Sequence, residues 1–228
     1  MPDIEHFLQT LAIWALPLIL GITLHEAAHA YAAKELGDPT AQERGRVSLN
    51  PLRHVDPFGT IVLPGLLLLL QAGIVFGYAK PVPVNPRRLR DPRWGMAWVA
   101  LAGPASNLLQ ALVAVFLISL LPGLGQEPGG FLASMLIVMV YINCLLAILN
   151  MLPVPPLDGG RILVALLPPA AGAKLLAFSR KGVFLLLILF LVWPLLNRQL
   201  GLGFDPLSIL ITEPSLWLTH SLLSLSGR

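Results

Sequence analysis

Three polar side chains stand together in an otherwise apolar stretch near the start of the sequence. His25, Glu26 and His29 lie in GITLHEAAHA, which continues a run with almost no other polar residue. On a helix the two imidazoles lie about one turn apart on the same face, where both can bind one zinc ion. Glu26 lies on the neighbouring face, within reach of a water at that metal. The pattern predicts metal-assisted hydrolysis with Glu26 as the general base.

The alternative interpretation is a chance match, in which two helix histidines only make hydrogen bonds. An ionisable residue at the centre of a membrane helix costs roughly 2.5–3.5 kcal/mol on insertion scales, so such residues usually serve a function. Three of them in five positions favour the metal site over the chance match.

A catalytic zinc needs a third protein ligand and an open fourth position. Asp158 is one candidate, because it lies in NMLPVPPLDGGRI (residues 150–162), where prolines end a helix and two glycines permit unusual backbone angles. The same aspartate is equally well placed to cap the helix that follows it. Other residues considered are Glu35, His54 and Asp56. We expect three histidines to be surface or interfacial residues rather than ligands: His6, His54 and His220.

The composition predicts a membrane protein that crosses the bilayer several times. Of the 228 residues, 56% are hydrophobic and 12% are charged, about half the usual charged share, and the mean hydropathy is +0.77. Four apolar runs are candidate spans, of which the last is a little short: about 8–33, 94–121, 131–152 and 182–196. We expect an all-α polytopic membrane protein with a core of three membrane helices and one or two C-terminal helices. The tail 197–228 is either interfacial or a further helix.

A fifth apolar run, residues 60–79, is either another span or a segment that enters the membrane and returns. The basic residues of loops 34–58 and 80–93 would lie on opposite sides of the membrane if this run crossed it, against the usual bias of basic loops toward the cytoplasm. We therefore expect a re-entrant segment, with both loops and the chemistry beside them toward the cytoplasmic side.

Charge and cysteine content exclude other classes. The net charge of +3 comes from basic residues in short loops between apolar runs, which points to membrane topology rather than to nucleic acid. The single cysteine, Cys144, excludes a disulfide framework and a multi-cysteine zinc site.

HEAAH in a membrane helix, with NMLPVPPLDGGRI some distance after it, resembles the site-2 protease family of intramembrane zinc metalloproteases. FGYAKPVPVNP (residues 76–86), GPASN (residues 103–107) and NPLRHVDPFGT (residues 50–60) are similar to further segments of that family. The resemblance covers about residues 20–165. The resemblance is to the compact form of the family, which has no inserted PDZ domain and no added CBS domain.

The resemblance implies one zinc per chain, bound by His25, His29 and Asp158, with Glu26 as the general base. It implies that Asn150 supports substrate or the oxyanion, and it places Asn107 beside the metal helix in a similar supporting role. Substrates would be transmembrane segments of other proteins in the lipid bilayer. We expect one integral membrane protease domain over 1–228, with its catalytic core at about 8–165 and C-terminal helices at about 182–225.

Two other functions use similar residues. A membrane metal transporter, or a metal-binding scaffold without hydrolysis, would also place histidine and aspartate inside the membrane. Glu26 argues against the transporter, which needs no base beside its ligands. A scaffold descended from an enzyme would be expected to have lost Glu26 or a ligand. We further expect Asn143 to make only an interhelical hydrogen bond, and the segment PVPVNP (residues 81–86) to offer an edge to an unwound substrate.

Overall fold

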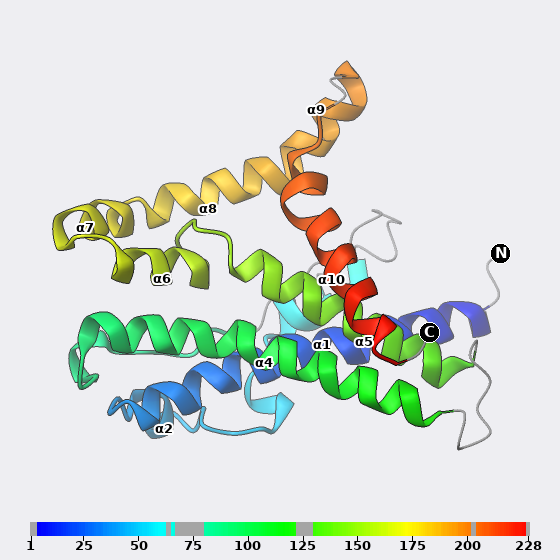
Figure 1. Cartoon of the computed structure of the whole chain (residues 1–228), viewed down its shortest axis with the longest axis horizontal. Helices are drawn as coiled ribbons and strands as arrows, with labels where there is room; N and C mark the ends of the chain where they lie inside the picture. Colours follow the sequence, from blue (N-terminus) through cyan, green and yellow to red (C-terminus); the bar gives the residue numbers. More distant parts are fainter. Residues whose placement is uncertain (1–3, 63–64, 67–79, 122–129, 202–203, 227–228) are drawn as a thin grey trace.

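Three long helices form the centre of the computed structural model, which describes residues 4–62, 65–66, 80–121, 130–201 and 204–226 (Figure 1). They are α1 (Ile4–Glu35), α4 (Pro92–Leu120) and α5 (Phe131–Asn150), and each packs against the other two. All three contain a stretch long and apolar enough to cross a membrane. The protein is therefore an integral, multi-pass membrane protein, and the predicted all-α fold with three core membrane helices is confirmed.

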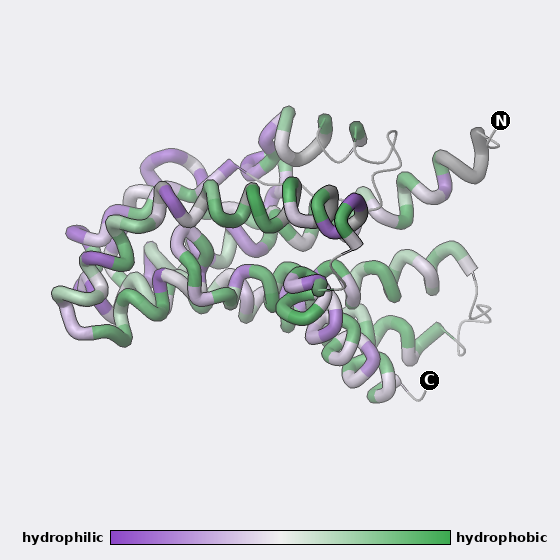
Figure 2. The backbone as a smooth tube through the Cα atoms, turned by 90° about the horizontal axis from the view of Figure 1, so that it is seen from above, coloured by the Kyte–Doolittle hydropathy of each residue, from purple (hydrophilic) through white to green (hydrophobic). Residues whose placement is uncertain are grey.

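The outer faces of these helices carry large apolar side chains. Trp98, Leu109 and Phe116 on α4 are each about half exposed or more, a pattern that suits contact with lipid hydrocarbon rather than water. Figure 2 shows hydrophobic residues dominating the part of the molecule near the two termini, whereas hydrophilic residues gather toward the opposite end. α2 (Thr40–Glu43), which follows α1, lies at this second end (Figure 1).

Shorter elements complete the described chain. They are α2 (Thr40–Glu43), η1 (Pro51–Arg53), η2 (Pro57–Val62), η3 (Pro86–Arg88), α6 (Asp158–Leu166), α7 (Pro169–Ala177), α8 (Ser179–Leu187), η5 (Ile188–Val192), α9 (Trp193–Leu200), η6 (Ser208–Thr212) and α10 (Glu213–Ser224). Of these, α6 packs against α4, and α10 packs against α5 and α4. The predicted C-terminal helices are thus present, and part of the tail is a helix packed on the core.

The fourth predicted span, about 182–196, is not one long α-helix. α8, the π-helical η5 and α9 follow one another through this region, and it is not among the helices that qualify as spans in the described part of the chain. Pro194 has no N–H group to donate within a helix, which explains an interruption before it. The fourth candidate run is therefore helical, but it does not form one long α-helix.

The connections on either side of the predicted re-entrant segment lie together. The N–H group of Lys80 donates to the carbonyl oxygen of His54 over 2.9 Å, and that of Arg90 donates to Leu36 over 3.0 Å. Most of residues 60–79 lies outside the described residues, so the re-entrant path stays a prediction. Its two flanks nevertheless meet at the hydrogen bond between Lys80 and His54.

Asp38, just after α1, anchors the segment that leads to α4. Its carboxylate is buried and accepts hydrogen bonds from the Thr40 hydroxyl (2.5 Å), the Thr40 N–H (3.0 Å) and the Asn85 N–H (2.6 Å). Burial alone would raise the pKa of this carboxyl. The three hydrogen bonds and the nearby charge of Arg88 outweigh burial and hold the pKa below its ordinary value of 3.8.

The lowered pKa predicts a stability contribution that depends on pH. Because the folded carboxyl has the lower pKa, the contribution is complete above about pH 4 and is lost as the pH falls further through the folded value. We expect Asp38→Asn to lower the unfolding temperature in detergent at pH 7, and the gap from the unsubstituted protein to narrow below about pH 4. A gap that stays constant down to pH 3 would contradict this role.

Candidate metal centre

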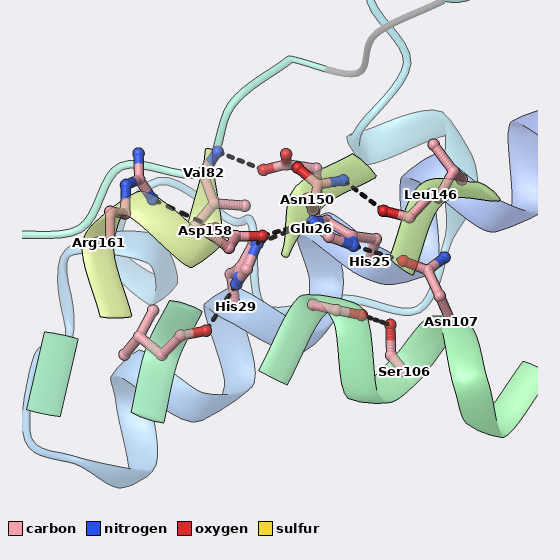
Figure 3. Close-up of polar contacts among 12 residues, drawn as sticks. His25, Glu26, His29, Val82, Ser106, Asn107, Leu146, Asn150, Asp158 and Arg161 are labelled. Atoms are coloured by element: carbon pink, nitrogen blue, oxygen red, sulfur yellow. Dashed lines mark hydrogen bonds and ion pairs between the residues drawn. The ribbon is translucent and has the colours of Figure 1, made fainter. Parts of the chain in front are cut away.

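Two helices bring His25, His29 and Asp158 together inside the protein (Figure 3). His25 and His29 come from α1, and Asp158 is the first residue of α6. The two Nε2 atoms are 3.0 Å apart, and Asp158 Oδ2 lies 3.1 Å from Nε2 of His25 and 3.3 Å from Nε2 of His29. All three side chains are buried. The residues predicted as ligands therefore converge on one point inside the protein.

Asp158 reaches this point because the chain reverses sharply after α5. Gly159 and Gly160 lie so close to the backbone of Met151, Val154 and Pro155 that a Cβ atom at either glycine would overlap it. α6 is therefore packed directly on the turn that precedes it. The N-cap of α6 is Leu157, so Asp158 does not cap the helix, and the helix N-terminus favours its negative charge near the histidines.

Arg93 holds the other end of α6. Its Nε and Nη2 atoms donate to the carbonyl oxygens of Ala165 (2.6 Å) and Leu167 (2.8 Å). These carbonyls end α6 and have no partner further along the helix. The first turn of α4 thus fixes the position of α6, whose first residue is Asp158.

Gly103 forms the wall against which both imidazoles lie. A Cβ atom at this position would be 2.5 Å from Cε1 and Nε2 of His25 and 2.5 Å from Cε1 of His29. No side chain fits there without moving a ring. The first residue of the GPASN motif is therefore a glycine because α4 must pass directly beneath the two histidines, whereas Ala105 of the same motif is exposed.

The hydrogen bonds on the far side of each ring determine which nitrogen carries the proton. His29 Nδ1 is 2.7 Å from the carbonyl oxygen of Val99, which can only accept, so Nδ1 must donate. His25 Nδ1 is 2.6 Å from Oδ1 of Asn107. The amide nitrogen of Asn107 donates to the Gly21 carbonyl over 3.0 Å, so Oδ1 is correctly placed as the acceptor. Both neutral rings therefore present a bare Nε2 lone pair.

Three acceptors consequently face one another. Two Nε2 lone pairs and Asp158 Oδ2, which is buried without a hydrogen-bond donor, lie within 3.3 Å. Such an arrangement is repulsive unless a metal ion, or a proton on one of the rings, lies among the three atoms. Two imidazole nitrogens and one carboxylate oxygen are a ligand set of catalytic zinc sites. The donor set therefore fits a zinc ion.

Glu26 lies beside this group and is oriented by a backbone donor. Its Oε2 accepts from the N–H of Val82 over 2.8 Å (Figure 3). Val82 is the one residue of Pro81–Val82–Pro83 with an N–H group. The neighbouring Lys80 and Asn85 also use their N–H groups within the protein. A substrate strand added along this segment would find mainly carbonyl oxygens.

The other predicted residues have different surroundings. Asn107 is buried, and both of its amide hydrogens are used within the protein, so it serves His25 rather than offering a donor to an oxyanion. Asn150 ends α5, and its Nδ2 donates to the Leu146 carbonyl over 3.0 Å. That contact satisfies a carbonyl in the last turns of α5, and support of an oxyanion stays a prediction.

The other candidate third ligands do not belong to the group of three. Glu35 is exposed at the end of α1. Asp56 accepts from the N–H groups of Phe58 and Gly59. His54 is fully buried, with Nε2 donating to the Ser48 carbonyl over 2.8 Å. The expectation of a surface or interfacial His54 was therefore wrong, because the loop after α1 folds over it.

Three contributors were not singled out from the sequence. Val82 and Val99 act through backbone groups, which no side-chain pattern reveals. Arg93 was counted only as a loop charge, although its position next to the Asp91 N-cap of α4 indicates that it lies at a helix start.

The fold and the site define a membrane protein with a buried His–His–Asp group and an adjacent glutamate. The sequence pattern of Peptidase family M50 matches residues 126–193. "Putative zinc metalloprotease YwhC" of Bacillus subtilis is 41% identical over 191 residues, which cover 79% of this chain and 84% of that protein. "Putative zinc metalloprotease Rip2" of Mycolicibacterium smegmatis is 32% identical over 193 residues, which cover 84% of this chain and 70% of that protein. No solved structure matches the chain.

The chain belongs to Peptidase family M50, the site-2 protease family. It is a zinc metalloprotease of that family with membrane-spanning helices. The predicted family and the predicted class of enzyme are confirmed.

Proposed function

We propose that this chain is an intramembrane endopeptidase that hydrolyses peptide bonds in or near transmembrane segments of other membrane proteins. The observation that carries the proposal is the group of three converging acceptors, His25, His29 and Asp158, with Glu26 beside it. These three residues would hold a single zinc ion.

When bound, zinc would supply a Lewis acid that polarises the scissile carbonyl group and makes an adjacent water more acidic. Glu26, oriented by the Val82 N–H, takes a proton from the attacking water and passes it to the leaving amine. Asn107 and the Val99 carbonyl keep Nδ1 of each ring protonated, so that each Nε2 stays available. Asn150, at the end of α5, supports the substrate or the oxyanion.

The depth of the site supports cleavage within the membrane. His25 precedes the end of α1 at Glu35 by ten residues, and Gly103 follows the start of α4 at Pro92 by eleven. At the rise of an α-helix, both distances are roughly 15 Å, about half the thickness of the hydrocarbon core. The hydrophilic end of the molecule carries Arg88, Arg90 and Arg93, and we propose that this end faces the cytoplasm.

Transport of a metal ion is supported less well. A transport path needs a succession of sites, whereas the described residues contain one group of three residues able to hold a metal. Glu26 is also explained by hydrolysis and not by transport.

The proposal is tested by removing and restoring the metal. We expect the detergent-purified protein to contain about one zinc per chain and to cleave a single-span test substrate. Cleavage should stop after treatment with a strong chelator and return on addition of zinc. If the protein binds zinc but leaves substrates of varied sequence intact, while proteoliposomes containing it take up zinc, the transporter interpretation replaces this one.

A further inference from the structure

A chain of side-chain amides runs from α5 through α4 to the metal centre. Asn143 on α5 is fully buried, and its Oδ1 accepts from Nδ2 of Asn107 over 2.8 Å. Asn107 on α4 in turn accepts from His25 on α1 over 2.6 Å. All three membrane-spanning helices therefore contribute one side chain to a continuous line of hydrogen bonds that ends at a proposed zinc ligand.

The donor and acceptor roles along this line of hydrogen bonds are fixed by backbone carbonyl groups, which can only accept. Nδ2 of Asn143 donates to the Met139 carbonyl over 2.9 Å, so its Oδ1 must face Asn107. Nδ2 of Asn107 has two acceptors, Asn143 Oδ1 and the Gly21 carbonyl. Backbone carbonyls only accept, so rotating either amide would set acceptor against acceptor.

We propose that Asn143 is a positioning residue for His25, from which it is separated by Asn107. It holds the Asn107 amide so that Oδ1 accepts from Nδ1 of His25, and the ring then keeps its Nε2 lone pair toward the metal. This inference rests on the proposed metal site and goes beyond the simple interhelical contact that the sequence suggested for Asn143.

The surroundings of Asn107 and Asn143 make the loss of either amide group costly. Asn107 and Asn143 are buried between helices, where an amide left without a partner is destabilising. Gly21 lets α1 approach α5 closely enough that a Cβ there would lie 3.5 Å from Asn143 Oδ1. Without Asn143, one of the two acceptors that orient Asn107 is lost, and the amide is held by the Gly21 carbonyl alone.

The experiment is a double-substitution cycle read out by zinc affinity rather than by proteolysis. Asn143→Leu, Asn107→Leu and the double variant are purified in detergent, and zinc affinity is measured by competition with a chelator of known strength. Substitution of groups that orient a metal-bound histidine typically lowers metal affinity 10–100-fold. We expect about tenfold for Asn143→Leu and nearer 100-fold for Asn107→Leu. The double variant should be no weaker than Asn107→Leu, because Asn143 acts only through Asn107.

Two controls separate positioning from general damage to the fold. Cys144→Ala removes an atom from an equally buried neighbour on α5 that belongs to an apolar cluster between α4 and α5, covered by α10, and its zinc affinity should be unchanged. Asn143→Asp keeps an oxygen that accepts from Nδ2 of Asn107 and should restore most of the affinity.

Each other result overturns the inference. If Asn143→Leu lowers zinc affinity by the same factor in the unsubstituted protein and in the Asn107→Leu variant, Asn143 is a structural residue that acts independently of Asn107. Unchanged zinc affinity in Asn143→Leu would show that Gly21 alone orients Asn107. A protein without zinc before any substitution would instead contradict the proposed metal site.

Discussion

Replacing Glu26 with glutamine is expected to slow proteolysis severely while leaving zinc bound. The Val82 N–H group donates to Glu26 over 2.8 Å. The glutamine Oε1 can accept the same hydrogen bond, so the side chain should keep its place. It cannot take a proton from water, and loss of a general base typically costs 10²–10⁴-fold in rate, so about that decrease is expected. Cleavage of a single-span test substrate and zinc content are measured on the same preparation.

Two controls make this result specific. Glu35→Gln removes the same charge from an exposed position at the end of α1 and should retain both zinc and activity. Asp158→Ala removes a proposed ligand and should lose both. If Glu26→Gln cleaves as fast as the unsubstituted protein, the metal centre serves something other than hydrolysis.

The fold was largely predictable because hydrocarbon constrains a sequence more strictly than water does. A helix that crosses the bilayer must be apolar over some 20 residues, so α1, α4 and α5 were visible as long runs. The region 182–196 is equally apolar, but apolarity does not report where a backbone changes from α- to π-helix. That change depends on local geometry before Pro194, and a hydropathy pattern carries no trace of it.

The metal centre was predictable where side chains act and not where the backbone does. His25, Glu26 and His29 share one helix, and spacing alone places them. Asp158 is about 130 residues away, and the residues around it suited a helix cap as well as a ligand. The chain reversal onto α6 brings it to the histidines, because Gly159 and Gly160 permit close contact with the preceding turn.

Orientation of the rings lies beyond any pattern of spacing. The Val99 carbonyl belongs to a helix interior, and Val99 was one apolar residue of a membrane run among many. Gly103 and Asn107 were noticed only as the two ends of the GPASN motif, which gave no reason for a glycine at position 103. The structure shows that both imidazoles lie against Gly103, where any side chain would occupy their space.

Replacing Gly103 with alanine is expected to eliminate zinc binding without unfolding the protein. The new Cβ would lie 2.5 Å from atoms of both rings, far inside contact distance. Neither ring can retreat freely, because Asn107 and the Val99 carbonyl hold the two Nδ1 atoms at 2.6 and 2.7 Å. Alanine favours a helix over glycine by about 0.5–1 kcal/mol, so α4 itself should persist. We expect zinc content and cleavage both to fall below detection while the circular dichroism spectrum stays helical.

Gly95→Ala is the matched control, because Gly95 is also a buried glycine of α4. The nearest atoms to a Cβ there all belong to the Leu89 side chain, at 3.2 Å or more, so a shift of a few tenths of an ångström relieves the contact and neither imidazole is touched directly. This variant should therefore retain zinc and activity. The comparison isolates the space beneath the imidazoles as the cause of the loss, since both substitutions add one methyl group to the same helix. Normal zinc affinity in Gly103→Ala would mean that the two rings do not lie against α4 as described.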